Sequence, residues 1–175
     1  DKDSARLIWQ GIAEIVDGDK RKGVAYLRQG IPLAAEQGMG AEDQMAILSI
    51  QAYGEESIGE TDAAQSTRSA ALEMATEAEG MGWSSPGLDA TTGLLLRLDG
   101  QRSKAEARMR TAIDRGWRDY WNAKSHPAFA ELIADDVFGE LLNEVEEDVQ
   151  RMRAVVDRLE EEDAARSRVA GTILR

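Results

Sequence analysis

The chain carries many acidic side chains but almost none of the other groups on which catalysis or metal binding depends. Of its 175 residues, 33 are Asp or Glu, 21 are Lys or Arg, one is histidine and none is cysteine. Disulfides, thiolate nucleophiles and cysteine-based metal sites are therefore excluded. A catalytic or metal-binding role for His126 would need a second His or a Cys. We therefore interpret His126, which directly precedes Pro127, as a surface or capping residue.

Two short patterns resemble ligand-binding motifs but lack the required spacing. An Asp-Gly-Asp sequence at 17–19 could begin a calcium loop, yet basic residues at 20–22 stand where further oxygen ligands are needed. Gly-Met-Gly sequences at 38–40 and 80–82 lack the third glycine of a dinucleotide fingerprint, and no Walker or nucleophile-elbow motif occurs. We therefore expect no catalytic residue, no cofactor and no metal ion, and we predict that the chain is not an enzyme.

Composition narrows the classes of partner. The formal net charge of −12 disfavours direct contact with nucleic acid, because phosphates are repelled, whereas a basic peptide is compatible with it. At 42% hydrophobic and 31% charged residues, the chain is too apolar for a disordered acidic tail and too charged for a membrane span. The start at Asp1 has no basic and apolar leader, so we expect no signal peptide. We predict a soluble protein of the cytoplasm or the periplasm.

An internal repeat indicates the elements that position these residues. Gly18, Gly59 and Gly100 are separated by 41 residues, and each follows an apolar segment typical of a helix. Small residues that recur in two successive helices allow those helices to approach closely, so the spacing predicts one helical hairpin used three times. The same period aligns three further columns of small residues: Gly11, Ala52 and Gly93; Gly23, Ala64 and Ala105; and Gly30, Ala71 and Ala112.

The ends of the predicted helices carry appropriate stop and start residues. Glycines close the second helix of each hairpin, and Ser85-Pro86 combines an N-cap residue with proline at the first helical position. We expect Pro32 to kink its helix unless the helix stops there. The expected helices are 4–16, 20–37, 42–57, 62–79, 86–98 and 102–115. They form hairpins at about 4–40, 41–82 and 83–116, followed by a capping segment and long helix at 117–165 and a frayed tail at 166–175.

This order of small residues resembles the tetratricopeptide repeat. The match is clearest in the third unit, with small residues Gly93, Gly100, Ala105 and Ala112 and the large apolar Met109. The middle unit departs from the pattern, because Arg68 stands where the other units have Leu27 and Met109. The resemblance implies an all-α, right-handed superhelix of three hairpins plus C-terminal capping helices. The 41-residue period exceeds the usual length of about 34, and HEAT-like or armadillo-like hairpins are the alternative.

The segment after the third hairpin resembles one that closes tetratricopeptide arrays in bacterial signalling proteins, including cyclase-linked and winged-helix-linked regulators. It contains Gly116-Trp117, Tyr120, Trp121, Pro127-Ala128-Phe129 and Asp135 to Leu142, with His126 and Val137 replacing the usual Asp and Pro. An array must cover the apolar face of its last hairpin, so we predict a cap built from Trp117, Trp121, Phe129, Phe138 and Leu141. The alternative is an aromatic ligand pocket of Trp117, Tyr120 and Trp121.

A helical stripe follows the cap. Its apolar residues are Leu142, Val145, Val149, Met152, Val156 and Leu159, at alternating spacings of three and four. We expect this stripe to dock on the third hairpin of its own chain. The alternative is pairing with a second copy through 142–159, so the chain is expected to be a monomer or a homodimer.

Recognition is the function that this sequence favours. In a tetratricopeptide array the first helix of each hairpin lines a concave groove that binds peptides or helices. We therefore predict a protein-interaction scaffold or sensor module of a bacterial regulatory or signalling protein, with a protein or peptide partner and no membrane insertion. A small-molecule-sensing domain or the non-catalytic part of a larger enzyme is the alternative. The 41-residue register assigns partner-binding positions to Ile12, Ser49, Tyr53, Glu56, Leu94 and Arg97.

Overall fold

The computed structural model describes residues 2–119, 123–124, 126–132 and 136–173, and every regular element among them is a helix. The all-α prediction is confirmed, and the first six helices agree with their predicted bounds to within two residues at each end. The described helices are α1 (Lys2–Asp17), α2 (Lys20–Glu36), α3 (Ala41–Ser57), α4 (Thr61–Gly80), α5 (Pro86–Leu98), α6 (Arg102–Asp114), α8 (Pro127–Leu132) and α9 (Asp136–Ile173). None of these combines the length and apolarity needed to cross a lipid bilayer.

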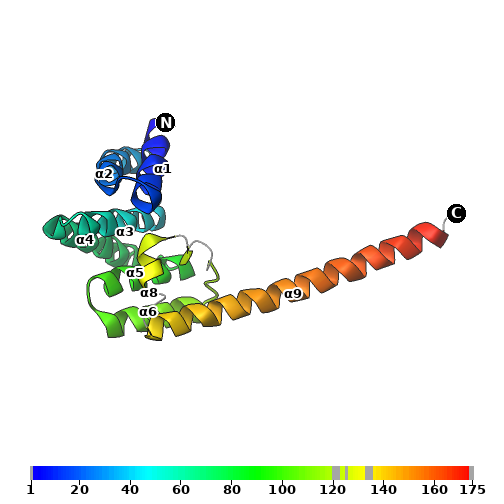
Figure 1. The fold of residues 1–175 in the computed structure, drawn as a ribbon. Helices are drawn as coiled ribbons and strands as arrows, with labels where there is room; N and C mark the ends of the chain where they lie inside the picture. The colour runs from blue at the N-terminus through cyan, green and yellow to red at the C-terminus, as the bar shows by residue number, and fades with distance from the viewer. Residues whose placement is uncertain (1, 120–122, 125, 133–135, 174–175) are drawn as a thin grey trace.

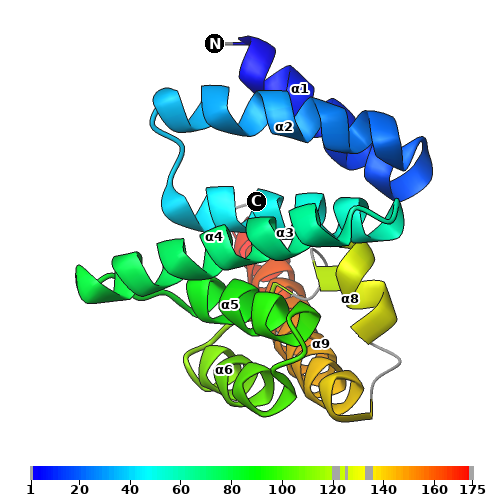
Figure 2. The ribbon, with the colours of Figure 1, turned by 90° about the vertical axis from the view of Figure 1, so that its left-hand side faces the viewer.

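The first six helices form three stacked hairpins. Helix α1 packs along α2, α3 along α4, and α5 along α6, while α3 also contacts α2 and α5 and so joins the layers. Figure 2 shows the three layers one below another, and Figure 1 shows α8 beside α3 and α5. Helix α9 begins against α6 and then leaves the body of the array (Figure 1). The chain is therefore a helical-repeat array with one projecting helix.

Small residues occupy the points where paired helices touch. A Cβ atom on Gly11 would lie 2.6 Å from Cδ2 of Leu27, and one on Gly23 would lie 2.8 Å from the carbonyl oxygen of Gly11. In the other hairpins, the alanines of the same columns are fully buried, as Ala64 and Ala112 show with 0% exposure. The repeat columns thus mark helix contacts, as the period predicts.

The turns of the repeat are alike in two hairpins and different in the first. Gly59 and Gly100 adopt φ values of +81° and +76°, in the left-handed region where side chains other than glycine are strained. Gly18, the third member of this column, does not adopt a positive φ. Instead, the side chain of Asp19 caps α2 by accepting hydrogen bonds from the backbone amides of Arg21 and Lys22.

Two residues that interrupt the sequence pattern are accommodated by the fold. Pro32 lies within α2, which continues to Glu36, and its side chain is exposed. Arg68 is 7% exposed. Its Nη1 lies 3.1 Å from a carboxylate oxygen of Glu56, and its Nε lies 3.9 Å from a carboxylate oxygen of Asp99. The middle hairpin therefore replaces an apolar contact with a buried cation between two carboxylates.

The predicted cap is present for the residues that the structure describes. Trp117, Phe129, Phe138 and Leu141 are buried in one cluster with Met109 of the third hairpin. The other predicted members of the aromatic group, Trp121 and Tyr120, lie outside the described residues. The cap therefore covers the end of the third hairpin.

The apolar stripe of α9 is covered only in its first part, which corrects the docking prediction. Val145 is fully buried and Val149 packs partly against the body, but Met152, Val156 and Leu159 are 48%, 51% and 54% exposed. The body ends before these side chains, so the third hairpin cannot reach them. The backbone of α9 is helical to Ile173, whereas the sequence predicts a frayed tail from residue 166.

Candidate binding groove

A hollow of about 560 Å³ lies on the side of the array formed by the first helices of the hairpins. Helices α1, α3 and α5 supply its long walls. One side is closed by Trp117, Asp119, Ala123, His126, Pro127 and Phe129. Most of its lining side chains are apolar. The hollow is therefore a groove across three repeat units, bounded by the cap.

The groove is a direct product of the repeat. Residues Ala5, Ile8, Trp9 and Ile12 lie on one face of α1, because their spacing of three, one and three matches the helical period. The same face of α3 and α5 lines the groove at positions shifted by the 41-residue period. These columns are Ala5, Ala46 and Gly87; Ile8, Ser49 and Ala90; Trp9, Ile50 and Thr91; and Ile12 with Leu94.

His126 ties the closing segment to the middle of α3. Its Nε2 lies 2.9 Å from Oγ of Ser49, and the Ser49 hydroxyl donates to the carbonyl oxygen of Ala46 at 2.7 Å. The backbone amide of Ala128 donates to Nδ1 of His126 at 3.2 Å. Because Nδ1 accepts a hydrogen bond, the ring proton belongs on Nε2, which then donates to Ser49. The chain of bonds fixes a neutral imidazole in one tautomer.

Burial lowers the pKa of His126 from 6.5 to about 4. Its ring also meets Phe129 edge to face, with the ring centroids 5.5 Å apart. His126 is half-buried, so of the two predicted roles the capping role fits it better. No group of three His, Asp or Glu side chains among the described residues is placed to hold a metal ion.

Among the residues that the structure describes, the charged side chains that line the groove are all acidic. They are Glu42, Asp43 and Asp119. Glu42 accepts a hydrogen bond from the Ser85 hydroxyl at 2.6 Å, which holds its carboxylate at the start of α5. A low-dielectric concave surface concentrates the field of such charges, so the groove favours cationic groups.

Trp9 is the most exposed aromatic residue among those that line the groove. It is 71% exposed, although it lies between buried or half-buried neighbours such as Ile8 and Ile12. Tryptophan presents a large apolar surface with one hydrogen-bond donor, and it is enriched where partners bind. Trp9 therefore provides an anchoring surface at the open edge of the groove.

The groove contains half of the positions that we predicted from the sequence. Ile12, Ser49 and Leu94 line it, whereas Tyr53, Glu56 and Arg97 do not. Tyr53 packs beneath the Lys20 ammonium, which lies 4.9 Å from the ring centroid, and Glu56 forms the ion pair with Arg68.

The groove begins closer to the N-terminal ends of the first helices than we expected. The residues that we missed include Ala5, Ile8 and Trp9, which precede Ile12 by about one or two helical turns. The signal that could have found them was available. Stepping back from Ile12 along the same helix face leads to Trp9, an aromatic residue on an otherwise small or aliphatic face.

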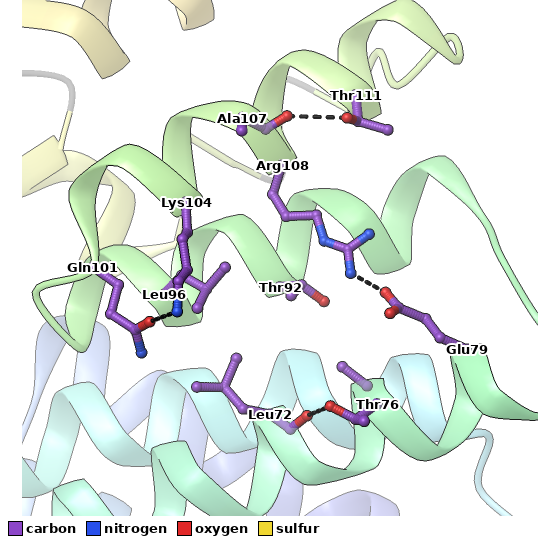
Figure 3. Close-up of a pocket in the computed structure, with 11 residues that line it drawn as sticks. Leu72, Thr76, Glu79, Thr92, Leu96, Gln101, Lys104, Ala107, Arg108 and Thr111 are labelled. Atoms are coloured by element: carbon purple, nitrogen blue, oxygen red, sulfur yellow. Dashed lines mark hydrogen bonds and ion pairs between the residues drawn. The ribbon is translucent and has the colours of Figure 1, made fainter.

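A second hollow of about 510 Å³ is lined by residues of α4, α5 and α6 (Figure 3). Its polar side chains bind one another: Arg108 pairs with Glu79, and Lys104 donates to the side chain of Gln101 at 2.8 Å. The hydroxyl of Thr92 is buried without a hydrogen-bond partner among the described residues. Because an ion pair already spans this gap, the groove on the other side of α5 is the better candidate site.

The groove therefore offers apolar surface, one exposed tryptophan and negative charge, which together suit recognition. The only histidine has its ring nitrogens engaged with Ser49 and a backbone amide. A scan against protein-family models and searches of curated proteins and of solved structures found no match to this chain.

Proposed function

We propose that this chain is a tetratricopeptide-like interaction module that binds a peptide or helix of another protein in the groove. The observation that carries this proposal is the continuous face of equivalent positions on α1, α3 and α5, with Trp9 exposed at its edge. A partner that lies across three repeat units contacts each of them through the same type of position. An extended or helical segment fits such a surface better than a compact ligand does.

The binding energy comes mainly from burying apolar surface. Covering Trp9 and the half-buried Ile12 removes from water side chains that contribute roughly 1.5–3 kcal/mol each when fully buried. Interface energies concentrate in a few such residues, and tryptophan is prominent among them. Trp9 is therefore the residue whose loss should weaken binding most.

Charge selects among apolar partners. Because Glu42 and Asp43 line the groove and none of its described lining residues is a lysine or arginine, a partner with Lys or Arg beside its apolar anchors is favoured. A net charge of −12 on the whole chain acts in the same direction. Acidic peptides and nucleic acids are disfavoured on the same ground.

The parent protein is proposed from sequence resemblance. The Gly-Trp, Pro-Ala-Phe and Leu-Leu pattern after the third hairpin supports placing the module in a bacterial regulatory or signalling protein. In that setting the module would bring a partner to another domain and would perform no chemistry itself.

Small-molecule sensing is the second candidate, and the size of the groove favours it. Pockets for small ligands are commonly about 300–1,000 Å³ and mostly apolar, and the hollow of about 560 Å³ falls in this range. Its open edge at Trp9 argues for the larger partner, because a small ligand would leave that side chain in water.

A peptide selection tests the proposal. A display library of random peptides about 12 residues long is selected on the wild-type chain, and fluorescence anisotropy then measures the affinity of the enriched peptides. We expect the enriched peptides to be basic and apolar. Trp9→Ser should lower their affinity for the chain at least about tenfold. The matched control is Trp83→Ser, because Trp83 is 42% exposed but does not line the groove.

Two outcomes would overturn the proposal. One is enrichment of peptides that bind Trp9→Ser as tightly as the wild type. The other is no enrichment combined with a rise in melting temperature for a compound in a panel of small apolar ligands. That second result would favour the sensing function.

A further inference from the structure

Two equivalent spaces between successive hairpins differ in the polar side chains that they contain. The space between the second and third hairpins holds the hollow of about 510 Å³ that α4, α5 and α6 line (Figure 3). Because the hairpins repeat every 41 residues, each residue that lines this hollow has a counterpart one repeat earlier, between the first and second hairpins. The two spaces can therefore be compared residue by residue.

Between the first and second hairpins, a buried carboxylate is held by three side chains. Glu55 is 1% exposed. Its Oε1 accepts hydrogen bonds from Arg28 at 2.9 Å and from Gln51 at 2.8 Å, and its Oε2 accepts one from Thr67 at 2.7 Å. A buried carboxylate is tolerated when a cation pairs with it and donors satisfy its oxygens. The chain thus supplies both this carboxylate and the groups that hold it.

Between the second and third hairpins, the carboxylate is missing but a buried donor is present. Leu96 stands at the position of Glu55, and Thr92 stands at the position of Gln51. Thr92 is 4% exposed, and its hydroxyl, which faces the hollow in Figure 3, has no hydrogen-bond partner among the described residues. Buried polar groups without a partner are rare, because each loses its bonds to water. A bound molecule can satisfy this hydroxyl.

Lys104 gives the hollow a positive charge that is not balanced. Its ammonium donates to the neutral side-chain oxygen of Gln101 at 2.8 Å, and no carboxylate among the described residues pairs with it. In Figure 3, Lys104 and Gln101 lie at one end of the hollow, the ion pair of Arg108 and Glu79 lies at the other, and Thr92 lies between them. The flexible stem of a lysine allows its ammonium to turn toward an anion.

We infer that the hollow binds a small organic carboxylate, whose carboxylate group takes the place that the Glu55 carboxylate has one repeat earlier. The Thr92 hydroxyl donates to one oxygen, as the Gln51 amide does in the equivalent space. Lys104 of α6 supplies the cation that Arg28 of α2 supplies there. A charge-assisted hydrogen bond to the ammonium is stronger than one between neutral groups, so the charged acid binds better than its neutral analogues.

The rest of the lining defines the body of this ligand. Leu72, Ala75, Leu96 and Ala107 provide apolar surface beside the polar groups. The volume of about 510 Å³ falls within the usual range for small-ligand pockets, about 300–1,000 Å³. Aromatic acids such as benzoate, phenylacetate and 4-phenylbutanoate combine an apolar body with one carboxylate. The hollow shares no lining residue with the groove, so this inference is independent of the peptide-binding function.

An NMR titration of the complete chain tests binding and its location together. Benzoate, phenylacetate and 4-phenylbutanoate are each added at up to about 10 mM, and the primary amide of each acid is the neutral control. We expect at least one acid to bind with a dissociation constant of about 1 mM or below and its amide to bind about tenfold more weakly. The backbone amides of Thr92 and Lys104 should shift, and those of Ile12 and Ser49 in the groove should not.

Substitutions in the lining separate the charge from the hydroxyl. Lys104→Met should weaken binding of the acid about tenfold or more. Arg110→Met is the matched control, because it removes an equal charge from the same helix but not from the hollow. Thr92→Val should weaken the acid while raising the melting temperature of the empty chain, because it removes the unsatisfied hydroxyl. Binding of none of the three acids, or equal effects of Lys104→Met and Arg110→Met, would overturn the inference.

A further variant supplies the carboxylate from the chain itself and needs no ligand. Leu96→Glu places a carboxylate at the position equivalent to Glu55, and Leu96→Gln is the uncharged control. We expect Leu96→Glu to melt at a higher temperature than Leu96→Gln and to lose binding of the acid. Adding Lys104→Met to both should remove the difference in melting temperature. A Leu96→Glu chain that fails to fold where Leu96→Gln folds, or that binds the acid like the wild type, would contradict this placement of the carboxylate.

Discussion

The imidazole Nε2 of His126 lies 2.9 Å from the Ser49 hydroxyl oxygen, which joins two residues that are 77 positions apart. The first belongs to the segment that closes the array, and the second lies on the groove face of α3. Because Ser49 also donates to Ala46, the bond connects the cap to the backbone of a repeat helix. Cap and groove are thus one structure, and the groove should lose its closing wall when this bond breaks.

Acid should weaken the fold through His126. Its pKa falls from 6.5 to about 4 on folding, so the unfolded chain binds the proton first as the pH decreases. The stability that the fold gains from keeping His126 neutral is fully present above about pH 6.5. It is lost progressively between pH 6.5 and about 4. The loss should be on the order of 3 kcal/mol in the free energy of unfolding.

Urea unfolding at about pH 7 and about pH 4.5 measures this loss, with His126→Gln as the reference. Carboxylates titrate over the same range in both proteins, so the difference between their pH profiles reports the histidine. The groove carboxylates Glu42, Asp43 and Asp119 remain in both. If the free energy of unfolding changes equally with pH in the two proteins, then His126 is not held neutral by the fold.

Removal of the Ser49 hydroxyl should destabilise the chain without creating a large cavity. Ser49 is fully buried, and Ser49→Ala leaves the Nε2–H group of His126 without its acceptor. We expect a loss of about 1–3 kcal/mol in the free energy of unfolding, measured by urea titration. Ser57→Ala is the control, because its hydroxyl also donates to a backbone carbonyl but is exposed. Equal effects of the two substitutions would contradict the role of Ser49.

A substitution in a repeat column should be far more costly than one beside it. Ala112 is fully buried where α6 meets α5. Ala112→Leu should lower the free energy of unfolding by roughly 1–3 kcal/mol, because the larger side chain overpacks this contact. Ala107→Leu, on the exposed side of the same helix, should change the melting temperature little. If both variants have the same melting temperature, then the 41-residue columns do not mark helix contacts.

The period made the hairpins predictable, because a repeated pattern of small residues reports which helix faces must touch. Two of the positions that it predicts, Ile12 and Leu94, line the hollow of the first helices. It did not find Trp9, since the expected groove was set too close to the C-terminal ends of the first helices. The bond from His126 to Ser49 could not be predicted either, because no local pattern specifies a contact across so long a separation.

The stripe on α9 shows a different limit of sequence reasoning. Its spacing correctly predicts a helix with one apolar face, as the burial of Val145 confirms. The pattern continues unchanged through Leu159, however, and the spacing carries no information on where the covering surface ends. That position depends on the size of the third hairpin and its cap. Only the three-dimensional structure distinguishes the covered from the uncovered part.

The division of α9 predicts that its two halves differ in their contribution to stability. Phe138 is fully buried between the cap and the third hairpin, so Phe138→Ala should cost about 3–5 kcal/mol in the free energy of unfolding. Among the side chains that the structure describes, truncation after Arg151 removes only exposed ones, and it should leave the free energy of unfolding within about 0.5 kcal/mol of the full chain. Urea titration at low micromolar protein keeps self-association from adding apparent stability. A large loss on truncation would mean that the distal stripe packs on its own body, as its spacing predicts.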